Sequence, residues 1–378
     1  MSHRIRLGMV GGGQGAFIGA VHRIAARIDD QFELVAGCLS STPEKSAASA
    51  KEIGLARSYG SYEEMAVAEA AREDGIQAVA IVTPNHMHAP VAMAFLKAGI
   101  HVICDKPLTA TMDDALALEA AVADSGKLFV LTHNYTGYPL MREARAMVAR
   151  GDLGDILQIR AEYLQDWLAE APEPDQKQAA WRLDPAKAGA GALGDIGTHA
   201  YNLACFVAGE TAASVSAEAY ASVPGRVIDD TVSAHLRFAS GAKGLIFASN
   251  AAVGHENDLS LRIYGTKGSL SWRQEEPNKM FYAQFGQPVQ ILTRGTTDAQ
   301  GAGARVTRTP GGHPEGYLEA FATIYSDAAH AIRAHDDGTT LPDHHHTNTV
   351  GDGVAGMVFV AGCLASAKND AAWTPLIS

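Results

Sequence analysis

The sequence has few cysteines, no basic cluster and no long apolar run, and each shortage argues against a class of protein. Only four cysteines occur in 378 residues. They are scattered without a CxxC or Cys/His spacing, which favours buried thiols in a reducing compartment over disulfides or a cysteine-ligated metal. No apolar leader and no window of about 18 apolar residues is found, so we expect a cytoplasmic protein rather than a membrane protein.

Positive charge is also scarce. The chain has 30 Lys and Arg against 42 Asp and Glu, a formal net charge of −12. Without a basic run to follow a phosphate backbone, nucleic acid is not an expected partner. The histidine-rich segment DHHHTN, residues 343–348, offers three consecutive imidazoles that cannot all face one ion from regular structure. We therefore expect a solvated loop and no metal site there.

The first third of the chain alternates short β-like runs with amphipathic or alanine-rich stretches of helical length. The runs are IRLGMV, FELVAG, AVAIVT, HVICDK and LFVLTH. This alternation favours right-handed βαβ units and a parallel sheet, which is a nucleotide-binding architecture. With 378 residues and 47% hydrophobic composition, the chain is long enough for two domains, each with its own core.

A glycine-rich turn, GGGQGAFIGA, follows the first run and opens a helix. That context makes such a turn a pyrophosphate cradle. Gly11 and Gly13 occupy the first two glycine places of the dinucleotide-binding pattern. The third place falls on Ala16, or on Gly19 with the loop lengthened by three residues. A tight strand-to-helix turn without a ligand would also explain these glycines.

The end of the second run normally distinguishes the two nicotinamide cofactors. Here GCLSSTPEKS places Ser40 and Ser41 at the tip, where a carboxylate would accept the ribose hydroxyls. Thr42 and Pro43 indicate the start of the next helix. Lys45 is the only nearby cation and no Arg is present, so we favour NAD, although NADP is not excluded.

Two further turns place polar residues at the carboxyl ends of strands, where a doubly wound sheet binds its ligands. In TPNHMH, Pro84 ends the strand that closes on Thr83 and aims Asn85 and His88 over the sheet edge. A plain loop would explain those residues too.

The second of these turns is CDKP. Lys106 follows an apolar run and precedes Pro107, which holds the chain extended. We interpret Lys106 as a cation fixed near the nicotinamide. The alternative is a surface lysine paired with Asp105.

The ordered motifs VGGG, TPNHMH, CDKPLT, WRLDPAKAGAGALGDIGTH and YGTKGSLSW resemble the Gfo/Idh/MocA oxidoreductases, a family that includes glucose-fructose oxidoreductase and inositol dehydrogenases. The most specific parts are Asp105-Lys106-Pro107, where the family more often has Glu first, and the Asp-x-x-x-His of Asp195 and His199. The resemblance spans nearly the whole chain.

This resemblance implies an α/β fold with two domains. Residues 1–133 would form a Rossmann domain, a doubly wound parallel sheet that binds the dinucleotide. Residues 134–378 would form an α/β domain with a large open mixed sheet, used for substrate binding and for contacts in a homodimer or homotetramer. The small-molecule partner would be a carbohydrate or cyclitol.

Asp195 and His199 are the central residues of the expected active site. Residues four apart on a helix share a face, so both side chains can reach one point. A carboxylate beside an imidazole suits a base that takes one proton from a hydroxyl. The resemblance assigns His199 as the proton acceptor, Lys106 as the cation that stabilises the alkoxide, and Asp195 as the positioning group. A helix-capping Asp above a buried His is the alternative.

Further ligands are expected from the same motifs and from aromatic and polar residues of the second domain. The cofactor-binding set is Gly11, Gly13, Gln14, Phe17, Ile18, Ser40, Thr83, Pro84, Asn85, His88, Asp105, Lys106 and, by resemblance, Asn134. The substrate-binding set is Lys106, Tyr135, Trp167, Trp181, Arg182, Asp195, His199 and His313. Trp181 and Arg182 could instead brace the catalytic helix. The segment 293–312 is interpreted as a mobile loop over the site or over an oligomer neighbour.

Together these features predict an NAD(P)-dependent oxidoreductase acting on a secondary hydroxyl of a sugar, cyclitol or glycoside, in either direction. One alternative is a redox-neutral glycosidase that oxidises the sugar transiently, eliminates the aglycone, adds water and reduces the product. That route needs an extra base, for which Tyr135, Tyr138 and Tyr163 are available. A second alternative is a non-enzymatic NAD(P)-binding regulator, which would be expected to lose its catalytic residues.

Overall fold

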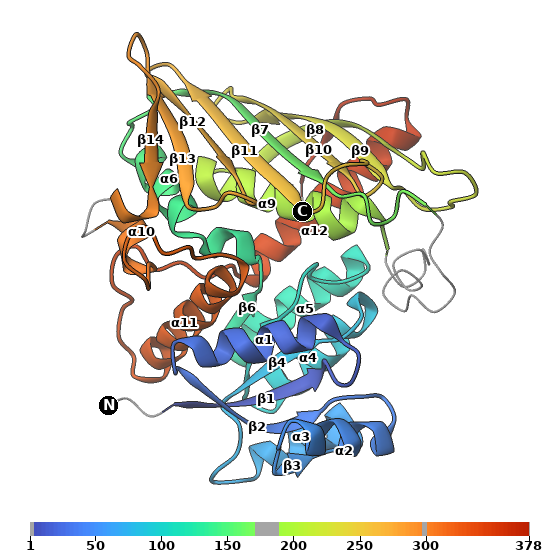
Figure 1. The fold of residues 1–378 in the computed structure, drawn as a ribbon. Coiled ribbons are helices and arrows are strands. Elements are labelled where there is room, and N and C mark those ends of the chain that lie inside the picture. The colour runs from blue at the N-terminus through green and yellow to red at the C-terminus, as the bar shows by residue number, and fades with distance from the viewer. Residues whose placement is uncertain (1–3, 171–188, 297–300, 378) are drawn as a thin grey trace. The chain divides into compact units, whose positions relative to one another are not determined.

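The computed structural model describes residues 4–170, 189–296 and 301–377. The chain forms two compact units. The first comprises Met1–Asn134 with Tyr317–Val354, and the second comprises Tyr135–Gly316 with Ala355–Ser378. Figure 1 labels the helices and strands of both units.

The first unit is built on a six-stranded sheet whose order is β3-β2-β1-β4-β5-β6. Every pairing is parallel. This is the order of a doubly wound dinucleotide-binding sheet. The strands are β1 (Ile5–Gly11), β2 (Phe32–Cys38), β3 (Arg57–Ser58), β4 (Ala78–Val82), β5 (His101–Cys104) and β6 (Phe129–Leu131). The five runs predicted from the sequence are confirmed as strands, and the two-residue β3 is an addition.

Helices alternate with these strands. They are α1 (Phe17–Ile28), α2 (Pro43–Glu52), α3 (Tyr62–Ala70), the 3-10 turn η1 (Asn85–Met87), α4 (His88–Lys97) and α5 (Met112–Ser125). Their starts follow from local chemistry. The predicted start of α2 is confirmed, with Thr42 at the cap and Pro43 in the first position. Thr111 caps α5 by accepting a hydrogen bond from the backbone N–H of Asp114.

A late helix, α11 (Tyr317–Asp336), completes the core of the first unit. Phe321 and Tyr325 of α11 belong to the same buried cluster as Val21 of α1. His22 joins them, with its Nδ1 2.7 Å from the Tyr325 hydroxyl. The first unit therefore includes a segment far beyond residue 133 in the chain.

The second unit contains a nine-stranded sheet of order β14-β13-β12-β11-β7-β10-β9-β8-β15. Only the β7–β10 pairing is parallel among the pairings described, so the sheet is mixed. The strands are β7 (Ile156–Leu164), β8 (Ala212–Tyr220), β9 (Thr231–Phe238), β10 (Lys243–Ser249), β11 (Asp258–Gly265), β12 (Gly268–Arg273), β13 (Lys279–Gln284), β14 (Gln290–Thr293) and β15 (Thr374–Pro375). The predicted large open mixed sheet is confirmed.

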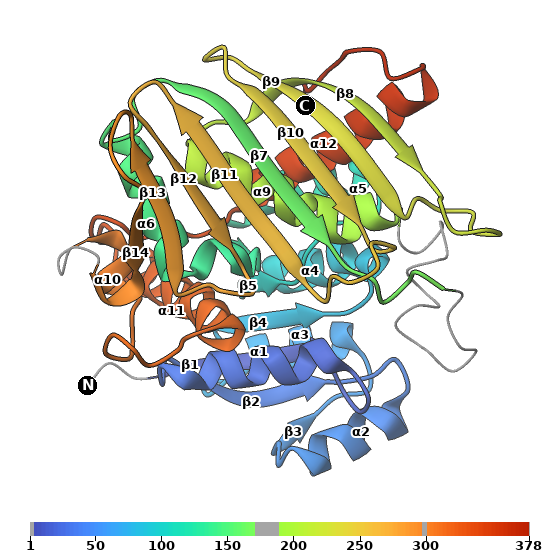
Figure 2. The same cartoon turned by 45° about the horizontal axis from the view of Figure 1, so that its top comes forward.

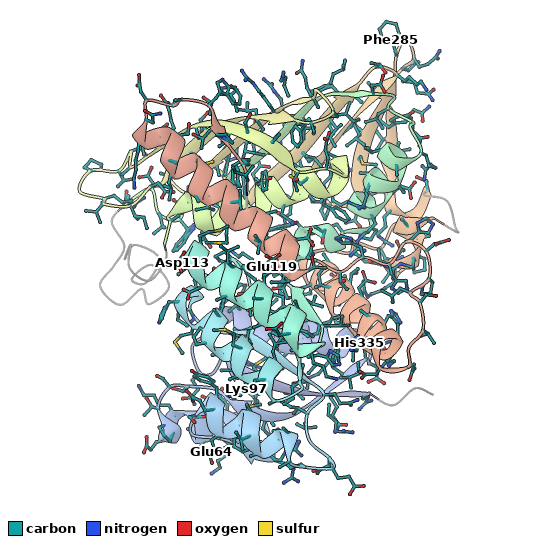
Figure 3. The ribbon with its side chains drawn as sticks, turned by 180° about the vertical axis from the view of Figure 1, so that it is seen from behind. Glu64, Lys97, Asp113, Glu119, Phe285 and His335 are labelled. Atoms are coloured by element: carbon teal, nitrogen blue, oxygen red, sulfur yellow. The ribbon has the colours of Figure 1, made fainter. Side chains whose placement is uncertain are left out.

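Helices cover one face of this sheet, as Figure 2 shows for α6, α9 and α12. The helical segments are η2 (Asn134–Gly137), α6 (Pro139–Ala149), η3 (Leu193–Gly197), α9 (Thr198–Ala208), η4 (Arg294–Thr296), α10 (Ala302–Arg305) and α12 (Val350–Lys368). The other face carries exposed apolar side chains. Tyr264, Phe281 and Ile291 are among them, and Phe285 stands exposed at the tip of the β13–β14 hairpin (Figure 3).

Helix α12 is long and apolar enough, by length and composition alone, to cross a membrane. The sequence reading that no window qualifies is therefore wrong for this helix. Half of its most apolar window is buried in the structure. Phe359 stacks on Tyr201 with ring centroids 4.2 Å apart, and the Ser366 hydroxyl accepts a hydrogen bond from the Ala217 N–H. These contacts are typical of a core helix.

The four cysteines are free thiols. Cys38, Cys104 and Cys363 are buried, and Cys205 is partly exposed. Burial raises the pKa of the Cys104 and Cys363 thiols. The expectation of buried thiols holds for three of the four.

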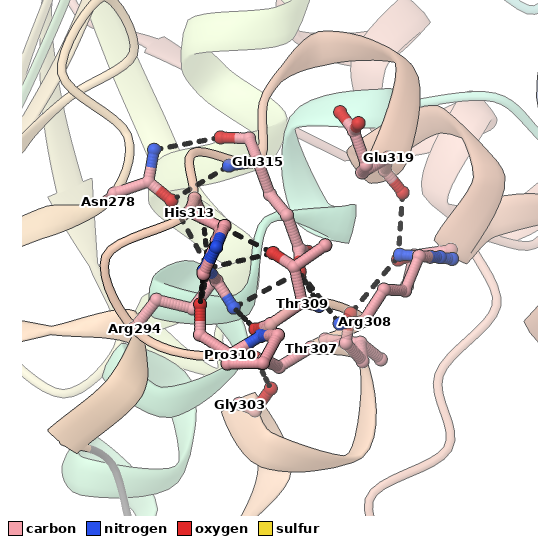
Figure 4. Close-up of polar contacts among 12 residues, drawn as sticks. Asn278, Arg294, Gly303, Thr307, Arg308, Thr309, Pro310, His313, Glu315 and Glu319 are labelled. Carbon is pink, nitrogen blue, oxygen red and sulfur yellow. Dashed lines mark hydrogen bonds and ion pairs between the residues drawn. The ribbon is translucent and has the colours of Figure 1, made fainter.

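The segment predicted as a mobile loop is anchored where the structure describes it. Arg294 and Glu315 form a buried ion pair, with 3.1 Å between Nη1 and Oε1. The guanidinium also donates to the carbonyl of Thr309 (2.6 Å), and the Glu315 carboxylate accepts from the backbone N–H groups of Arg308 (2.7 Å) and Thr309 (2.6 Å). Asn278, next to β13, joins the same network (Figure 4). Residues 306–316 are thus fixed to the β13–β14 hairpin.

We predict that Arg294→Met destabilises the protein by about 3–5 kcal/mol, because it leaves the buried Glu315 carboxylate without its cation. Denaturant unfolding measures the change. Arg262→Met serves as the control, because it removes a partly exposed pair with Glu162, and such pairs contribute about 0–1 kcal/mol. Equal losses in the two variants would contradict the assigned role of the buried pair.

Candidate active site

In the first unit a cavity of about 380 Å³ lies beside the glycine-rich turn. It is enclosed by that turn, the first turns of α1, the end of β2 and the last turn of α2. The lining residues are Gly12, Gly13, Gln14, Gly15, Ala16, Phe17, Ala20, Arg23, Leu39, Ser49, Glu52 and Ile53. The cavity therefore forms at the carboxyl end of β1, where an open α/β sheet binds its ligand.

Glycine contacts explain how the turn forms. A Cβ on Gly19 would lie 2.3 Å from the Gly12 carbonyl oxygen, and a Cβ on Gly13 would lie 2.5 Å from that of Leu39. Both positions exclude side chains, so α1 packs directly on the turn. Of the two residues considered for the third glycine place, Gly19 makes the close helix–turn contact, while Ala16 precedes α1 as its cap.

The polar lining of this cavity combines Gln14, which was predicted from the sequence, with Arg23, Ser49 and Glu52, which were not. The Gln14 N–H donates to Ser49 Oγ (3.2 Å), and the Gln14 amide donates to Glu52 (2.6 Å). The Arg23 guanidinium donates to the Gly12 carbonyl (2.7 Å). Ser40 is used locally, because its hydroxyl accepts from the Thr42 N–H. No sequence motif marks the helical positions of Arg23, Ser49 and Glu52, so their contacts with the turn could not be predicted.

The cavity fits a dinucleotide by its own geometry. Gly12 and Gly13 are packed against Gly19 and Leu39, whereas Gly15 has open space where a Cβ would project. At Gly15 no side chain separates the backbone from the cavity, so a pyrophosphate can approach closely. The first turn of α1 has no acidic residue, so its N–H groups face the ligand without a competing carboxylate. Phe17 opens the helix and is exposed.

A second cluster of the first unit lies at the carboxyl ends of β4, β5 and β6. The sequence reading aimed His88 over the sheet edge, but the structure buries it between two turns. Its Nδ1 is 2.8 Å from the Pro107 carbonyl and its Nε2 is 2.9 Å from the Thr83 carbonyl. Burial lowers the pKa of His88, while the charge of Asp105 and the contacts with these two carbonyls oppose the fall. His88 therefore ties the TPNHMH turn to the turn after Lys106.

Asp105 is the anion of this cluster. Its carboxylate accepts a hydrogen bond from Thr132 Oγ1 (3.0 Å) and lies 3.7 Å from Nε2 of His22. Burial alone would raise the pKa of Asp105, but the contact with His22 and the charge of Lys106 lower it to about 2. Asp105 is thus ionised at neutral pH and lies close enough to Lys106 for their charges to interact.

His133, which sequence reasoning did not select, lies near Lys106. Burial lowers its pKa to about 4, with the charge of Lys106 acting in the same direction and Asp352 and Asp105 opposing it. The neighbouring Asn134 is also buried, and its N–H donates to the Thr132 carbonyl (2.8 Å). The run LFVLTH gave a signal for this site, because a strand that ends in polar residues at a sheet edge resembles the other two turns.

In the second unit, Asp195 lies in the π-helical turn η3 and His199 in the first turn of α9. Another carboxylate, that of Asp229, holds this start in place. It accepts from the N–H groups of Gly191 (2.8 Å) and Leu193 (2.8 Å). Burial raises the pKa of Asp229, and these two backbone hydrogen bonds oppose the rise. The carboxylate that holds this helix start is therefore Asp229, which lies 34 residues after Asp195 and was not selected from the sequence.

His199 is buried against aromatic rings. The ring of Tyr135 meets it edge-on, with centroids 4.7 Å apart, and that of Tyr163 lies 6.1 Å away. The hydroxyls of the two tyrosines are hydrogen-bonded to each other. Tyr163 donates to Asn257 Oδ1 (2.8 Å), and Asn257 Nδ2 donates back to the Tyr135 hydroxyl (3.3 Å). These three side chains form a closed hydrogen-bonded ring beside His199.

The hydrogen bonds of this ring and its burial affect whether Tyr135 can lose its proton. Burial raises the pKa of Tyr135, so its phenol stays protonated at neutral pH. Asn257 was not selected from the sequence, because it precedes β11 and lies far from every motif. Gln165 donates to the same Asn257 oxygen (2.6 Å).

The remaining predicted substrate residues are dispersed. Trp167 is partly exposed, and its indole N–H donates to Gln165 (2.9 Å). His313 is exposed in the loop that Arg294 and Glu315 anchor. Trp181 and Arg182 lie outside the described residues. Asn202, three residues after His199, is buried on α9.

Comparison with known proteins agrees with both units. Residues 5–133 match the family described as "Oxidoreductase family, NAD-binding Rossmann fold", and residues 141–271 match the "GFO/IDH/MocA C-terminal domain". The chain belongs to the GFO/IDH/MocA oxidoreductase family. The resemblance stated from its motifs is confirmed, and the protein is an NAD-binding oxidoreductase.

Several members of this family are similar over most of the chain. An oxidoreductase from Sinorhizobium meliloti is 52% identical, with a TM-score of 0.90 over 98% of this chain and 99% of that one. An inositol dehydrogenase homolog from Azotobacter vinelandii, solved with NADH and myo-inositol, is 32% identical, with a TM-score of 0.92 over 99% and 98%. Levoglucosan dehydrogenase from Pseudarthrobacter phenanthrenivorans is 32% identical over 73% of this chain and 75% of its own.

We predict that Gly19→Ala raises the Kd of this oxidoreductase for NAD by about tenfold or more, because the new Cβ pushes α1 away from the turn. Isothermal titration with NAD measures the loss. Gly99→Asn is the control. Gly99 has a positive φ of 78° and open space around its Cβ, and Asn tolerates that conformation. Unchanged NAD affinity in Gly19→Ala would disprove the role of this contact.

A second prediction concerns pH. Because His133 is neutral in the fold with a pKa of about 4, the unfolded chain binds a proton that the folded chain excludes between about pH 6.5 and 4. The free energy of unfolding therefore keeps its full value above about pH 6.5. As the pH falls through this window, His133 lowers it by on the order of 3 kcal/mol. His133→Gln should flatten the slope of unfolding free energy against pH within the window. The pKa of His88 is also lowered by burial, so the contribution of His133 is the difference between the slopes of the wild type and the variant. An unchanged slope would contradict the assignment.

Proposed function

We propose that this oxidoreductase transfers a hydride between NAD and a secondary hydroxyl, or the matching ketone, of a sugar, cyclitol or glycoside. One observation carries the proposal. His199 is a buried imidazole one turn after Asp195, enclosed by the ring of Tyr135, Tyr163 and Asn257. Aromatic faces combined with fixed amide and hydroxyl groups suit a polyhydroxylated ligand. The relatives named for levoglucosan and inositol support the same substrate class.

The proposed roles follow from residue chemistry. His199 takes the proton of the reacting hydroxyl, because an imidazole near neutrality is an effective general base. Asp195 orients that base, and the Lys106 ammonium stabilises the oxygen as negative charge develops on it. Bound nicotinamide supplies the site that accepts or donates the hydride.

The dinucleotide would be held by the cavity of the first unit. The glycine turn and the start of α1 bind its phosphates through backbone N–H groups. We propose NAD over NADP because the Glu52 carboxylate lines this cavity, where it can accept ribose hydroxyls and would repel a 2′-phosphate. The nearby Arg23 already donates to the Gly12 carbonyl.

We also propose a cytoplasmic homodimer or homotetramer that uses the open face of the nine-stranded sheet. Strand register places Phe281 opposite Ser271 and Ile291, on the same face as Tyr264. All three large side chains are exposed. A second copy of the sheet would remove this apolar surface from water.

The glycosidase alternative requires a base for a carbon-bound proton. Tyr135 is poorly suited, since its hydroxyl proton is already donated within the ring with Tyr163 and Asn257, and burial raises its pKa. We therefore place net oxidation and reduction first.

Function is tested by incubating the protein with NAD or NADP and a panel of sugars, cyclitols and glycosides while monitoring reduced nicotinamide and released aglycone. We expect reduced nicotinamide without aglycone. His199→Ala should lower kcat about 10²–10⁴-fold, the usual contribution of a general base, while NAD affinity is retained. His335→Gln, which changes an exposed histidine in the last turn of α11, is the matched control. Aglycone release without net reduction would establish the glycosidase instead, and unchanged turnover in His199→Ala would refute its role.

A further inference from the structure

The histidine-rich segment 343–348, expected to be a solvated loop, is exposed at its start and becomes buried toward Asn348. The His345 side chain is 8% exposed, and Asn348 is buried. The Asn348 carbonyl accepts a hydrogen bond from the Leu131 N–H of β6 (2.8 Å). The segment therefore docks on the edge strand of the six-stranded sheet, within the first unit.

Docking brings His345 to two residues of α11. Asp327 and His330 are three apart on this helix and so share a face. His345 Nδ1 lies 3.4 Å from Asp327 Oδ1. The rings of His330 and His345 are nearly perpendicular, with centroids 4.9 Å apart. One ligand atom from each residue lies within 4.8 Å of the other two.

We propose that Asp327, His330 and His345 bind a divalent transition metal ion, zinc being the best match. Imidazole nitrogens and a carboxylate oxygen are zinc ligands, with bonds of about 2.0–2.2 Å, which places neighbouring ligand atoms of a tetrahedral site about 3.4 Å apart. The Asp327–His345 contact already has that spacing. The His330 nitrogen lies within 4.8 Å of the other two ligand atoms, so a small movement of its ring closes the set and water completes it.

Burial supports a charged ligand at this point. The Asp327 side chain is 1% exposed, among the apolar residues of α11. Carboxylates in such surroundings are paired or coordinate metals. His345 Nδ1 is itself buried and has no hydrogen-bond partner among the residues described. A cation bound between them would add to the contact that Asp327 and His345 already make.

A second group of possible ligands in the described chain lacks these properties. His101, His335 and Asp336 also gather near the end of α11. However, His101 Nδ1 accepts from the Leu128 N–H (3.0 Å), so Nε2 keeps its proton and donates to Asp336. Lys127 Nζ lies 3.8 Å from the same carboxylate. This group is a hydrogen-bonded ion pair, and His335 stands at the surface (Figure 3).

The metal would fasten α11 to the segment that leads into α12. That segment has no regular structure between residues 337 and 349. A bond between His345 and α11 fixes it at its centre, as the Leu131 contact does near its end. The site would stabilise the first unit without taking part in hydride transfer.

The test uses tag-free, full-length protein freed of metal with a chelator and then titrated with Zn²⁺ or Co²⁺. We expect one equivalent bound per chain, with the visible absorption of tetrahedral Co²⁺ and a raised thermal midpoint. His345→Ala should weaken Zn²⁺ binding at least about tenfold and abolish the thermal shift. Circular dichroism and NAD affinity show that this variant is folded.

Two control variants separate this site from chelation elsewhere. His344→Asn changes an exposed neighbour whose φ of 68° Asn tolerates, and His335→Ala disrupts the second group. Both should bind Zn²⁺ like the wild type. The proposal is overturned by no stoichiometric uptake, by equal uptake in His345→Ala, or by loss of uptake in His344→Asn.

Discussion

Buried carboxylates that accept backbone N–H groups hold the loops of the second unit. Asp229 does this before α9, Asp230 does it for the turn at Ser222 and Val223, and Glu315 does it for residues 308 and 309. A carboxylate can be buried at low cost only when such charge-assisted hydrogen bonds replace its water. Each of these loops is therefore ordered by one anion that accepts hydrogen bonds from two backbone N–H groups.

The consequence for the site is greatest at Asp229. A Cβ on Gly191 would meet the Asp229 carbonyl oxygen at 1.8 Å, so only glycine allows the chain to reach this cap. The cap fixes the turn from which Asp195 extends, and α9 continues from that turn to His199. The orientation of the proposed base thus rests on Asp229, which binds the backbone of the turn that leads into α9.

The sequence predicted the parts of the fold that periodicity and composition encode. Parallel strands buried on both faces read as continuous apolar runs, and β4, buried at every position, is the clearest example. The association of α11 with α1 was beyond such reasoning. The apolar face of α11 predicts a helix, but no local sequence pattern indicates whether that helix packs in the core of the first unit or of the second.

The same division applies to the candidate site. Motif residues such as Lys106, Asp195 and His199 stand out because their types and spacing are unusual. Their supports do not: Asn257, Asp229 and the buried contacts of His88 and His345 depend on partners distant in sequence. DHHHTN is an example, because only the fold shows that His345 lies against Asp327 and His330 of α11.

The ring of Tyr135, Tyr163 and Asn257 and the neighbouring His199 differ in how readily each can exchange a proton. Tyr135, Tyr163 and Asn257 form a closed ring in which each donor has an acceptor, and such a ring is strengthened by mutual polarisation. Removing a proton from it would break that circuit and create a buried phenolate, which the raised pKa of Tyr135 opposes. Protonation of His199 breaks no hydrogen bond of this ring and creates no phenolate. The ring is therefore suited to orienting hydroxyl groups, and proton transfer falls to His199.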